Sequence, residues 1–301
     1  MNQKILIIGS SNTDMVIQTD HLPAPGETIL GGTFFMAAGG KGANQAVAAA
    51  RLGGDVTFIC KLGNDMFGEQ AKALFRQEGI DTSYILTDAT LSSGIALIMV
   101  DKRAENVIAV ASGANGALNP NDLQNIDALI ADATILLVQL EIPLETVQYV
   151  VQIAFEKNIP VMLNPAPACS LPDGLLQCIS IITPNETEAE MLTGIKVTDV
   201  ASAQQAAHIL YHKGIPTVIV TLGSNGALVL HEGTFAHVPT IAVQAVDTTA
   251  AGDVFNGALA VALSQGKNIA EAAAFACKAA SISVTRLGAQ ASAPYRHEIA
   301  D

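Results

Sequence analysis

Short, continuous apolar runs recur along this chain, and they limit its possible folds more than any other feature. They lie at residues 5–8, 56–59, 135–138, 161–163, 179–182 and 218–220. A run of three or four such residues is typical of a parallel strand that is buried on both faces. Stretches of helical periodicity separate most of the runs, such as 66–77, 200–212 and one that starts at Pro143. Together they predict a doubly wound α/β fold with a mostly parallel central sheet flanked by helices.

Two segments depart from this pattern and predict a second, smaller sheet. Met15 to Met36 contains Pro23-Ala24-Pro25-Gly26 among short alternating pieces, and residues 94–100 with 106–110 have the pattern of a hairpin. We expect a small antiparallel β lid formed by roughly residues 13–38 and 92–112, within a single domain that spans residues 1–301. The lid could cover a ligand, and its exposed face could pair with a second subunit to form a homodimer.

Composition narrows the range of partners and compartments. The chain carries 15 Lys and Arg against 28 Asp and Glu, a net charge of −13, and it has no basic run, so nucleic acid is excluded as a partner. Cys60, Cys169, Cys178 and Cys277 show no C-x-x-C spacing, and no leading signal peptide is visible, which is typical of a cytoplasmic protein with reduced thiols. The apolar runs are too short to span a membrane.

The stretch Asp247-Thr248-Thr249-Ala250-Ala251-Gly252-Asp253 precedes a run of small apolar residues at helical spacing. We expect residues 250–253 to form the first turn of a helix, where free backbone N–H groups attract anions. Ala251 and Gly252 leave room for a phosphate to approach the backbone. The carboxylate of Asp253 is ill-suited to binding phosphate and suits a general base that removes a proton from an attacking hydroxyl. The alternative is that Asp253 only complements the helix dipole.

Further polar residues follow the predicted strands, where open α/β sheets bind their ligands. Asn12 and Asp14 follow the first strand, and Glu141 follows the strand that ends at Val138. Their amide and carboxylate groups suit neutral hydroxyls such as those of a sugar. Asn12 and Asp14 could instead be a turn-forming pair.

A glycine-rich segment, Gly39-Gly40-Lys41-Gly42-Ala43-Asn44-Gln45, leads into a predicted helix. It is not a Walker A loop, because Phe35 and Gly42 stand where that motif needs Gly and Ser or Thr. Lys41 and Asn44 suit recognition of hydroxyls or of a phosphate edge. The alternative is that the glycines serve only the contact between helix and sheet.

Two more segments allow both a structural and a functional interpretation. Asn185-Glu186-Thr187-Glu188 fits a capping box, and Asn185 with Glu188 could also orient water around Mg²⁺. The loop from Thr221 to Gly226 has the Asn-Gly signal of a hairpin turn and resembles a phosphate-binding loop only weakly.

Taken together, these motifs resemble the ribokinase family of sugar kinases over nearly the whole chain. The two family signatures match residues 39–46 and 247–253, and Asn185-x-x-Glu188 lies between them. Four further stretches carry the resemblance, at residues 9–14, 139–141, 163–168 and 285–290. The resemblance implies a kinase that transfers the γ-phosphate of Mg·ATP to O5 of D-ribose.

The resemblance also implies roles for individual residues. Asp253 would be the base, and Ala251 and Gly252 would form the anion hole. The implied ribose ligands are Asn12, Asp14, Gly40, Lys41, Asn44 and Glu141. The implied ATP ligands are Asn185, Thr221, Gly223, Ser224, Gly226, Gly252 and Cys277. A K⁺ site, mostly of backbone carbonyls, would lie at Asp247, Thr249, Ser283, Arg286, Gly288 and Ser292, and Glu188 would hold Mg²⁺ through water.

Two departures and three alternatives accompany this interpretation. Ala250 stands where the wider family commonly has Gly, and Cys277 stands where a polar residue is more usual. The substrate could be another small sugar, such as deoxyribose, or a nucleoside. From a different class, the protein could be a sugar-binding regulator without chemistry, although binding alone has no use for a base. An NAD-dependent dehydrogenase is excluded because no G-x-G-x-x-G follows the first strand.

Overall fold

The main body of the protein is built on one large twisted sheet. The computed structural model describes residues 3–103, 105–123 and 125–299. In these ranges the sheet has eight strands, in the spatial order β14 (Thr234–Val238), β13 (Ala227–His231), β12 (Thr217–Thr221), β11 (Ile181–Ile182), β10 (Val161–Leu163), β9 (Ile135–Val138), β1 (Lys4–Ile8) and β4 (Asp55–Ile59). The strands from β12 to β4 in this order are all parallel to one another. Strand β13 pairs antiparallel with both of its neighbours, β12 and β14. The predicted α/β fold class is confirmed.

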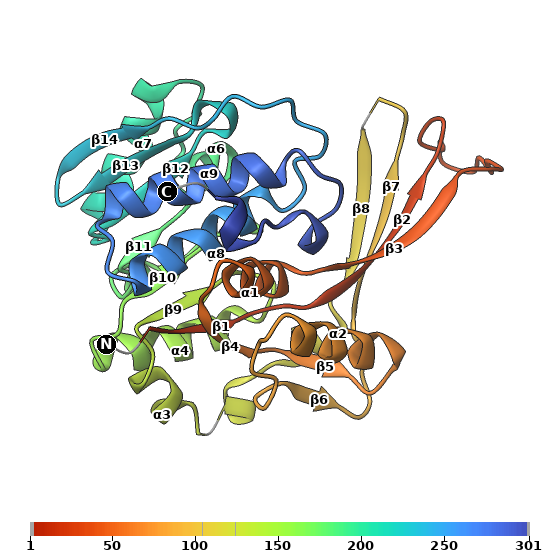
Figure 1. Ribbon diagram of the computed structural model, residues 1–301, viewed down its shortest axis with the longest axis horizontal. Helices are drawn as coiled ribbons and strands as arrows, with labels where there is room; N and C mark the ends of the chain where they lie inside the picture. The colour runs from red at the N-terminus through yellow and green to blue at the C-terminus, as the bar shows by residue number, and fades with distance from the viewer. Residues whose placement is uncertain (1–2, 104, 124, 300–301) are drawn as a thin grey trace.

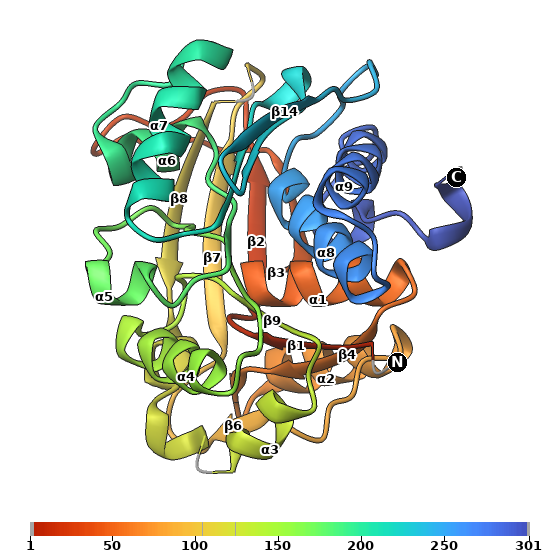
Figure 2. The ribbon, with the colours of Figure 1, turned by 90° about the vertical axis from the view of Figure 1, so that its left-hand side faces the viewer.

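Helices cover both faces of this sheet (Figure 2). One face carries α1 (Lys41–Arg51), α2 (Met66–Gln77), α8 (Ala251–Ser264) and α9 (Ile269–Ser283). The other carries α3 (Ile126–Ala131), α4 (Leu144–Glu156), α5 (Asp173–Leu176), α6 (Glu186–Thr193) and α7 (Val200–His212). The apolar strands are buried between these two helical layers.

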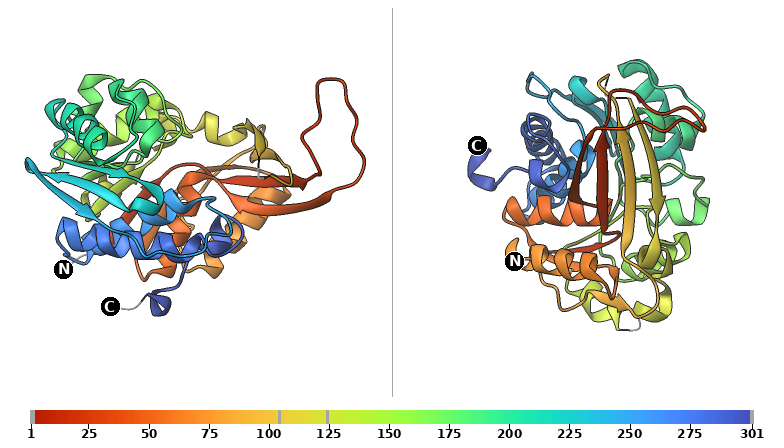
Figure 3. Two further views of the ribbon diagram at one scale, coloured as in Figure 1. Left: turned by 90° about the horizontal axis from the view of Figure 1, so that it is seen from above. Right: turned by 90° about the vertical axis from the view of Figure 1, so that its right-hand side faces the viewer.

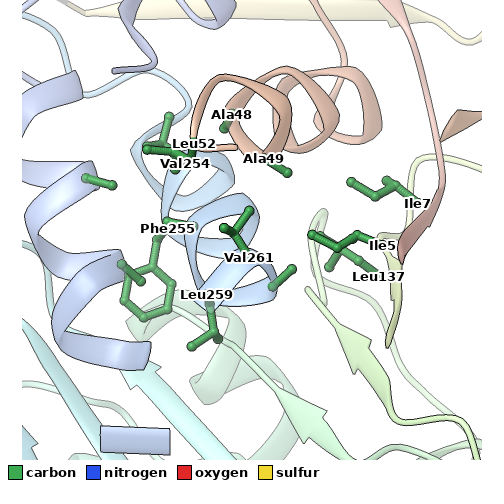
Figure 4. Close-up of a cluster of buried hydrophobic side chains, with 14 of the residues drawn as sticks. Ile5, Ile7, Ala48, Ala49, Leu52, Leu137, Val254, Phe255, Leu259 and Val261 are labelled. Atoms are coloured by element: carbon green, nitrogen blue, oxygen red, sulfur yellow. The ribbon is translucent and has the colours of Figure 1, made fainter. Parts of the chain in front are cut away.

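Strand β1 shows why the apolar runs are continuous. Ile5 and Ile7 belong to one core cluster, and Leu6 and Ile8 belong to the cluster on the opposite face. Successive side chains alternate between the two faces, so a strand covered on both sides has no polar position. In Figure 4, Ala49 of α1 and Val261 of α8 lie on the side that faces Ile5 and Ile7 of the sheet.

A four-stranded sheet stands off the main body (Figure 1), and we call it the β lid. Its order is β3 (Thr33–Gly39), β2 (Asn12–Gln18), β7 (Gly94–Val100) and β8 (Asn106–Ala111). The prediction of a wholly antiparallel lid was wrong in one respect, because the central pair, β2 and β7, is parallel. Both of these strands leave the main body in the same direction, and the outer strands return antiparallel to them (Figure 3).

Several local features complete the comparison with the sequence. Helices α2 and α7 have the predicted bounds, whereas β11 is shorter than the predicted run at 179–182. A two-stranded parallel sheet of β5 (Lys61–Gly63) and β6 (Leu86–Asp88) was not predicted, since strands of three residues are too short to show periodicity. Within the described ranges, no helix combines the length and apolarity that crossing a bilayer requires.

Candidate active site

The first turn of α8 forms the centre of the candidate site. Helix α8 starts at Ala251, after an N-cap residue, Ala250, in the left-handed conformation with φ of 58°. The predicted helix start is therefore confirmed. Asp253 lies at the third helical position and is only 5% exposed. A Cβ placed on Gly252 would meet no atom within 4 Å, so the backbone there faces open space. The turn can therefore present N–H groups to an anion.

Two cavities meet at this helix start. A smaller one, of about 160 Å³, is lined by Asp253 together with Lys41 and Glu188. A larger one, of about 600 Å³, extends away along α9 to Cys277. Both cavities are lined by Asn185, Thr221, Thr248, Ala251 and Gly252. Asp253 thus lies beside a cavity that adjoins a second, larger one, as two substrates that react with each other require.

Asp253 is held by two side-chain amides. Asn44 donates from Nδ2 to Oδ2 of Asp253 at 2.9 Å, and Gln45 donates from Nε2 to Oδ1 at 3.0 Å. Burial raises the pKa of Asp253, while Lys41 and these hydrogen bonds lower it and Glu141 raises it further. Burial lowers the pKa of Lys41, but the nearby carboxylates more than offset this and raise it. The site therefore keeps a buried carboxylate beside a lysine that stays protonated.

Asp14 on β2, Lys41 on α1 and Glu141 after β9 lie close enough to Asp253 for their charges to interact with it. The side chain of Asn12 instead accepts from Asn115 Nδ2 at 2.8 Å and borders a different cavity. Glu141 accepts from the backbone N–H of Lys41 at 3.0 Å and from Ser10 Oγ at 2.5 Å. Asn12 and Asp14 lie on β2 itself rather than in a turn, so the turn interpretation was wrong. Burial, followed by the charges of Glu141 and Asp253, raises the pKa of Asp14 to about 6.

The glycine-rich segment brings α1 against the strand ends. Gly40 has φ of 88°, and a Cβ there would lie 2.6 Å from the backbone N of Asn12. A Cβ on Gly42 would lie 2.6 Å from the backbone N of Ser10. Both distances are too short for any side chain, so these glycines do serve the contact between helix and sheet. The same close contact places Lys41 and Asn44 at the site.

The predicted nucleotide ligands line the larger cavity. These are Asn185, Thr221, Gly223, Ser224, Gly226, Gly252 and Cys277. Asn185 and Glu188 form the predicted capping box at the start of α6, and residues 223–225 make the predicted turn between antiparallel β12 and β13. Burial raises the pKa of Cys277 to about 11, which leaves its thiol neutral.

The residues predicted to hold K⁺ come from two adjacent loops. Asp247 accepts from Thr249 N and Oγ1 at 2.9 and 2.6 Å, and from the backbone N–H of Gly288 at 2.8 Å. The side chains of three others have partners elsewhere: Ser283 donates to Ala280 O, Ser292 to Ala289 O, and Arg286 pairs with Glu298. The structure thus joins the two loops through Asp247. Among the described residues, no group of three His, Cys, Asp or Glu side chains could hold a metal ion.

Sequence reasoning assigned no role to several buried amides of the site. Gln45 and Gln139 are fully buried, and Asn164 is nearly so. Asn256 donates from Nδ2 to the carbonyl of Gly252 at 2.8 Å. The first three lie in the segments that carry the family resemblance, which was the available signal.

Comparison with known proteins identifies the family. The model of the pfkB family of carbohydrate kinases matches residues 2–296. This chain belongs to that family. Ribokinase from Haemophilus influenzae is 49% identical over 298 residues, 99% of this chain and 97% of the relative. Deoxyribokinase from Salmonella typhi is 38% identical, over 96% of this chain and 95% of the relative.

A solved structure of another pfkB family member agrees. The structure of ribokinase from Arabidopsis thaliana complexed with ribose and ATP superposes with a TM-score of 0.90 at 34% identity, covering 99% of this chain and 97% of that chain. The family resemblance predicted from the motifs is therefore confirmed over the whole fold, and the protein is a carbohydrate kinase by family.

Proposed function

We propose that this protein transfers the γ-phosphate of ATP to O5 of D-ribose and so forms ribose 5-phosphate. The observation that carries the proposal is the position of Asp253, buried at the first turn of α8 beside the smaller of two adjoining cavities. The ribokinase relatives, including one complexed with ribose and ATP, support ribose as the sugar and ATP as the donor.

Ribose is bound by the amides and carboxylates on the Asp253 side of the site. The proposed ligands are Asn12, Asp14, Gly40, Lys41, Asn44 and Glu141. Asn44 is well suited to this role, because its Nδ2 holds Asp253 while its buried Oδ1 has no hydrogen-bond partner among the described residues. A sugar hydroxyl can donate to that oxygen, and the gain is large because an unsatisfied buried acceptor is costly.

Asp253 acts as the general base. It removes the proton from the 5-hydroxyl as O5 attacks the γ-phosphorus, and the bond from that phosphorus to the β,γ-bridging oxygen breaks to release ADP. The backbone N–H of Gly252 stabilises the negative charge of the transferring group, and that of Ala251 joins it by exchanging its 3.2 Å hydrogen bond to the carbonyl of Thr248 for a phosphoryl oxygen. Lys41, whose charge is kept by its carboxylate neighbours, adds a cation to the lining of the same cavity.

ATP occupies the larger cavity, with its phosphates toward Gly252. The turn at residues 223–226 and Asn185 then border the ribose unit and phosphates of ATP. The apolar part of the cavity, which includes Cys277, borders its adenine. Few charged side chains line this cavity, so shape and backbone groups determine binding there.

Mg²⁺ fits beside Glu188. This carboxylate borders the smaller cavity, is 8% exposed, and has a pKa raised by burial, so a nearby cation offsets the cost of its charge. From the described residues, each of its oxygens accepts one hydrogen bond, in both cases from Asn185. When bound, Mg²⁺ neutralises phosphate charge, and Glu188 and Asn185 orient its waters.

K⁺ fits the joined loops at Asp247, Thr249, Ser283, Arg286, Gly288 and Ser292. The carboxylate of Asp247 holds these loops together, and hydrogen bonds from Thr249 and Gly288 lower its pKa against the effect of burial. The ligands in this proposal are mainly backbone carbonyls, with Asp247 as the organising group. Omitting K⁺ should lower kcat, because the loop that contains Asp247 leads directly into Ala251.

The β lid closes over the sugar, and two subunits pair through their lids in a cytoplasmic homodimer. Large apolar side chains of the lid are widely exposed, such as Phe34, Leu97 and Val107 at 60%, 56% and 56%. An exposed apolar sheet of this kind is typical of an interaction surface. Light scattering at micromolar protein should give the mass of a dimer, and a monomer alone would contradict the pairing.

The direct test is turnover. Purified protein with ATP, Mg²⁺ and K⁺ should phosphorylate ribose, and ³¹P and ¹³C NMR of the product should place the phosphate on C5. Omitting K⁺ or replacing Mg²⁺ with EDTA tests each ion separately. A protein that binds ribose but forms no ADP would be a sugar-binding regulator, and the proposed activity would be wrong.

Deoxyribose is the second candidate substrate, because a deoxyribokinase matches 96% of this chain. The two sugars differ only in the 2-hydroxyl, and buried groups that bind a hydroxyl discriminate strongly against its absence. Comparing kcat/KM for ribose, deoxyribose, other small sugars and nucleosides decides between them.

A further inference from the structure

Gln45 uses both N–H donors and one acceptor position of its amide inside the protein. Its Nε2 donates to Asp253 Oδ1 and to Asn164 Oδ1, both at 3.0 Å, and its Oε1 accepts from Gln139 Nε2 at 2.5 Å. Gln45 and Gln139 are each 0% exposed. No water or substrate can therefore replace these partners without a rearrangement of the core.

These partners allow only one orientation of the Gln45 amide. An ionised carboxylate accepts hydrogen bonds only, so Asp253 must face the Nε2 end. Gln139 presents its own Nε2, so it must face the Oε1 end of Gln45. If the amide were reversed, oxygen would face oxygen at Asp253 and N–H would face N–H at Gln139.

Gln139 in turn is positioned by packing against the backbone, since its buried Oε1 has no hydrogen-bond partner among the described residues. A Cβ placed on Gly9 would lie 2.0 Å from Gln139 Oε1, so the side chain fills the space that this glycine leaves. A series of side chains thus connects Gln139, after β9, through Gln45 on α1 to Asp253 on α8. The two glutamines are far from Asp253 in sequence.

We propose that Gln139 and Gln45 form an amide relay that positions Asp253 for proton transfer and sets its basicity. Gln139 orients Gln45, and Gln45 holds one carboxylate oxygen of Asp253 while Asn44 holds the other. Both glutamines are positioning residues, since neither lines the cavity of the site. The inference rests on the proposed role of Asp253 as the base.

The relay leaves acceptor positions on the Asp253 carboxylate free for the substrate proton. A carboxylate has about four acceptor positions, and Asn44 and Gln45 take two, one on each oxygen. The remaining positions can receive the proton of a sugar hydroxyl. A carboxylate with fewer anchors could rotate out of line with that hydroxyl, at a cost in rate.

The relay also opposes the effect of burial on Asp253. Hydrogen bonds donated to the charged form stabilise it, as does Lys41, whereas Glu141 and burial favour the protonated form. The charges of Asp14 and Glu188 also interact with Asp253. Loss of the Gln45 donors therefore makes Asp253 harder to ionise.

The test is the pH dependence of kcat at saturating ribose and ATP. Gln45→Met keeps the length of the side chain and removes its donors. The acid limb of the pH profile of kcat should move to higher pH by about one unit in this variant, and the plateau value of kcat should fall about tenfold. KM for both substrates should change by less than about threefold, because Gln45 lines neither of the two cavities. Gln139→Met should move the limb in the same direction by less.

A matched control is Gln290→Met. This glutamine is 4% exposed and donates to the carbonyl of Gly39, but it does not contact Asp253. Its acid limb should coincide with that of the wild type, whatever its effect on thermal stability. The proposal is overturned if Gln45→Met and Gln139→Met fold normally and both keep the wild-type acid limb.

A second readout does not require activity. The carboxyl carbon of Asp253 can be titrated by NMR in ¹³C-labelled protein, with the resonance assigned by its loss in Asp253→Asn. A higher titration midpoint in Gln45→Met supports the relay, and an unchanged midpoint refutes it. If the wild type does not phosphorylate ribose, the proposed function fails, and this titration still decides whether the relay exists.

Discussion

The two cavities at the start of α8 are lined by different kinds of residue. The smaller cavity, which we call the sugar side, is lined by the charged groups of Lys41, Glu188 and Asp253, and the carboxylates of Asp14 and Glu141 lie close enough to interact with Asp253. The nucleotide side has glycines, a turn and apolar side chains such as Phe255 and Val243. Both sides share the first turn of α8.

This difference implies a different sensitivity to mutation. On the sugar side Asp253 and Glu141 are each held by two specific hydrogen-bond partners, so replacing either carboxylate leaves another group unsatisfied. On the nucleotide side the cavity depends on shape and backbone, which most side-chain changes preserve. We therefore expect large effects of substitution on the sugar side and small ones on the nucleotide side.

Asp253→Asn should give the largest effect. Asn has the same shape but cannot accept the proton, so kcat should fall by about 10²- to 10⁴-fold. A coupled ADP assay measures this, and circular dichroism checks the fold. Activity within tenfold of the wild type would show that Asp253 is not the base and would remove the main contrast between the two sides.

Asp14→Asn should come next. Sugar hydroxyls donate to the ionised carboxylate, and hydrogen bonds to charged groups are worth about 1.5–3 kcal/mol, so the ribose KM at pH 7.5 should rise by about 10- to 100-fold. In the wild type the pKa of Asp14 is about 6, so the ribose KM should rise as pH falls below that value. The variant should lose this dependence.

The same substitution should stabilise the fold at neutral pH. The pKa of Asp14 is higher in the folded state than its usual 3.8, so folded protein favours the protonated form, and stability is lost as pH rises from about 4 through about 6. Asp14→Asn removes that loss, and its Tm should exceed that of the wild type at pH 7.5 but not at pH 4. Asp20→Asn, an exposed change nearby, is the control and should alter neither KM nor Tm.

At the turn that both sides share, Ala250→Gly should stabilise the protein modestly. A left-handed conformation costs a residue with a side chain about 1–2 kcal/mol, and Ala250 has φ of 58°. Part of this gain is offset by the greater flexibility of unfolded glycine, so we expect about 1 kcal/mol in thermal unfolding. Ala251→Gly, inside the helix, should destabilise instead. Equal losses in both variants would contradict the assignment of strain to Ala250.

Cys277→Ala should have the smallest effect. The thiol lines the apolar end of the larger cavity, so its loss should change the ATP KM by less than about threefold. Because its pKa is raised to about 11, alkylation of Cys277 at pH 7.5 should be slow and should accelerate with pH, as peptide mass spectrometry can measure. A tenfold rise in the ATP KM would mean that side-chain identity matters on this side as well.

The sequence predicted the regular part of the fold well. Buried strands and amphipathic helices leave a periodic pattern, and the bounds of α2 and α7 follow from it. The parallel pairing of β2 with β7 leaves no such pattern, because Asn12–Gln18 and Gly94–Val100 alternate in the same way whichever direction they pair.

The candidate site was predictable where chemistry is local and hidden where it is not. Asp253 and the helix start are visible in one stretch of sequence. Gln45, Gln139 and Asn164 act through one another across three distant segments. An isolated glutamine in a sequence gives no sign that its amide will meet a carboxylate more than 200 residues away, at 3.0 Å. Only folding brings such partners together.

Strand β2 belongs to the lid and also carries Asn12 and Asp14 near its beginning. Any swing of the lid about this point displaces two of the proposed ribose ligands together with the cover itself. Capture of the sugar and exclusion of solvent then become a single mechanical step, and an enzyme built in this way gives bulk water little chance to compete with ribose for the phosphate.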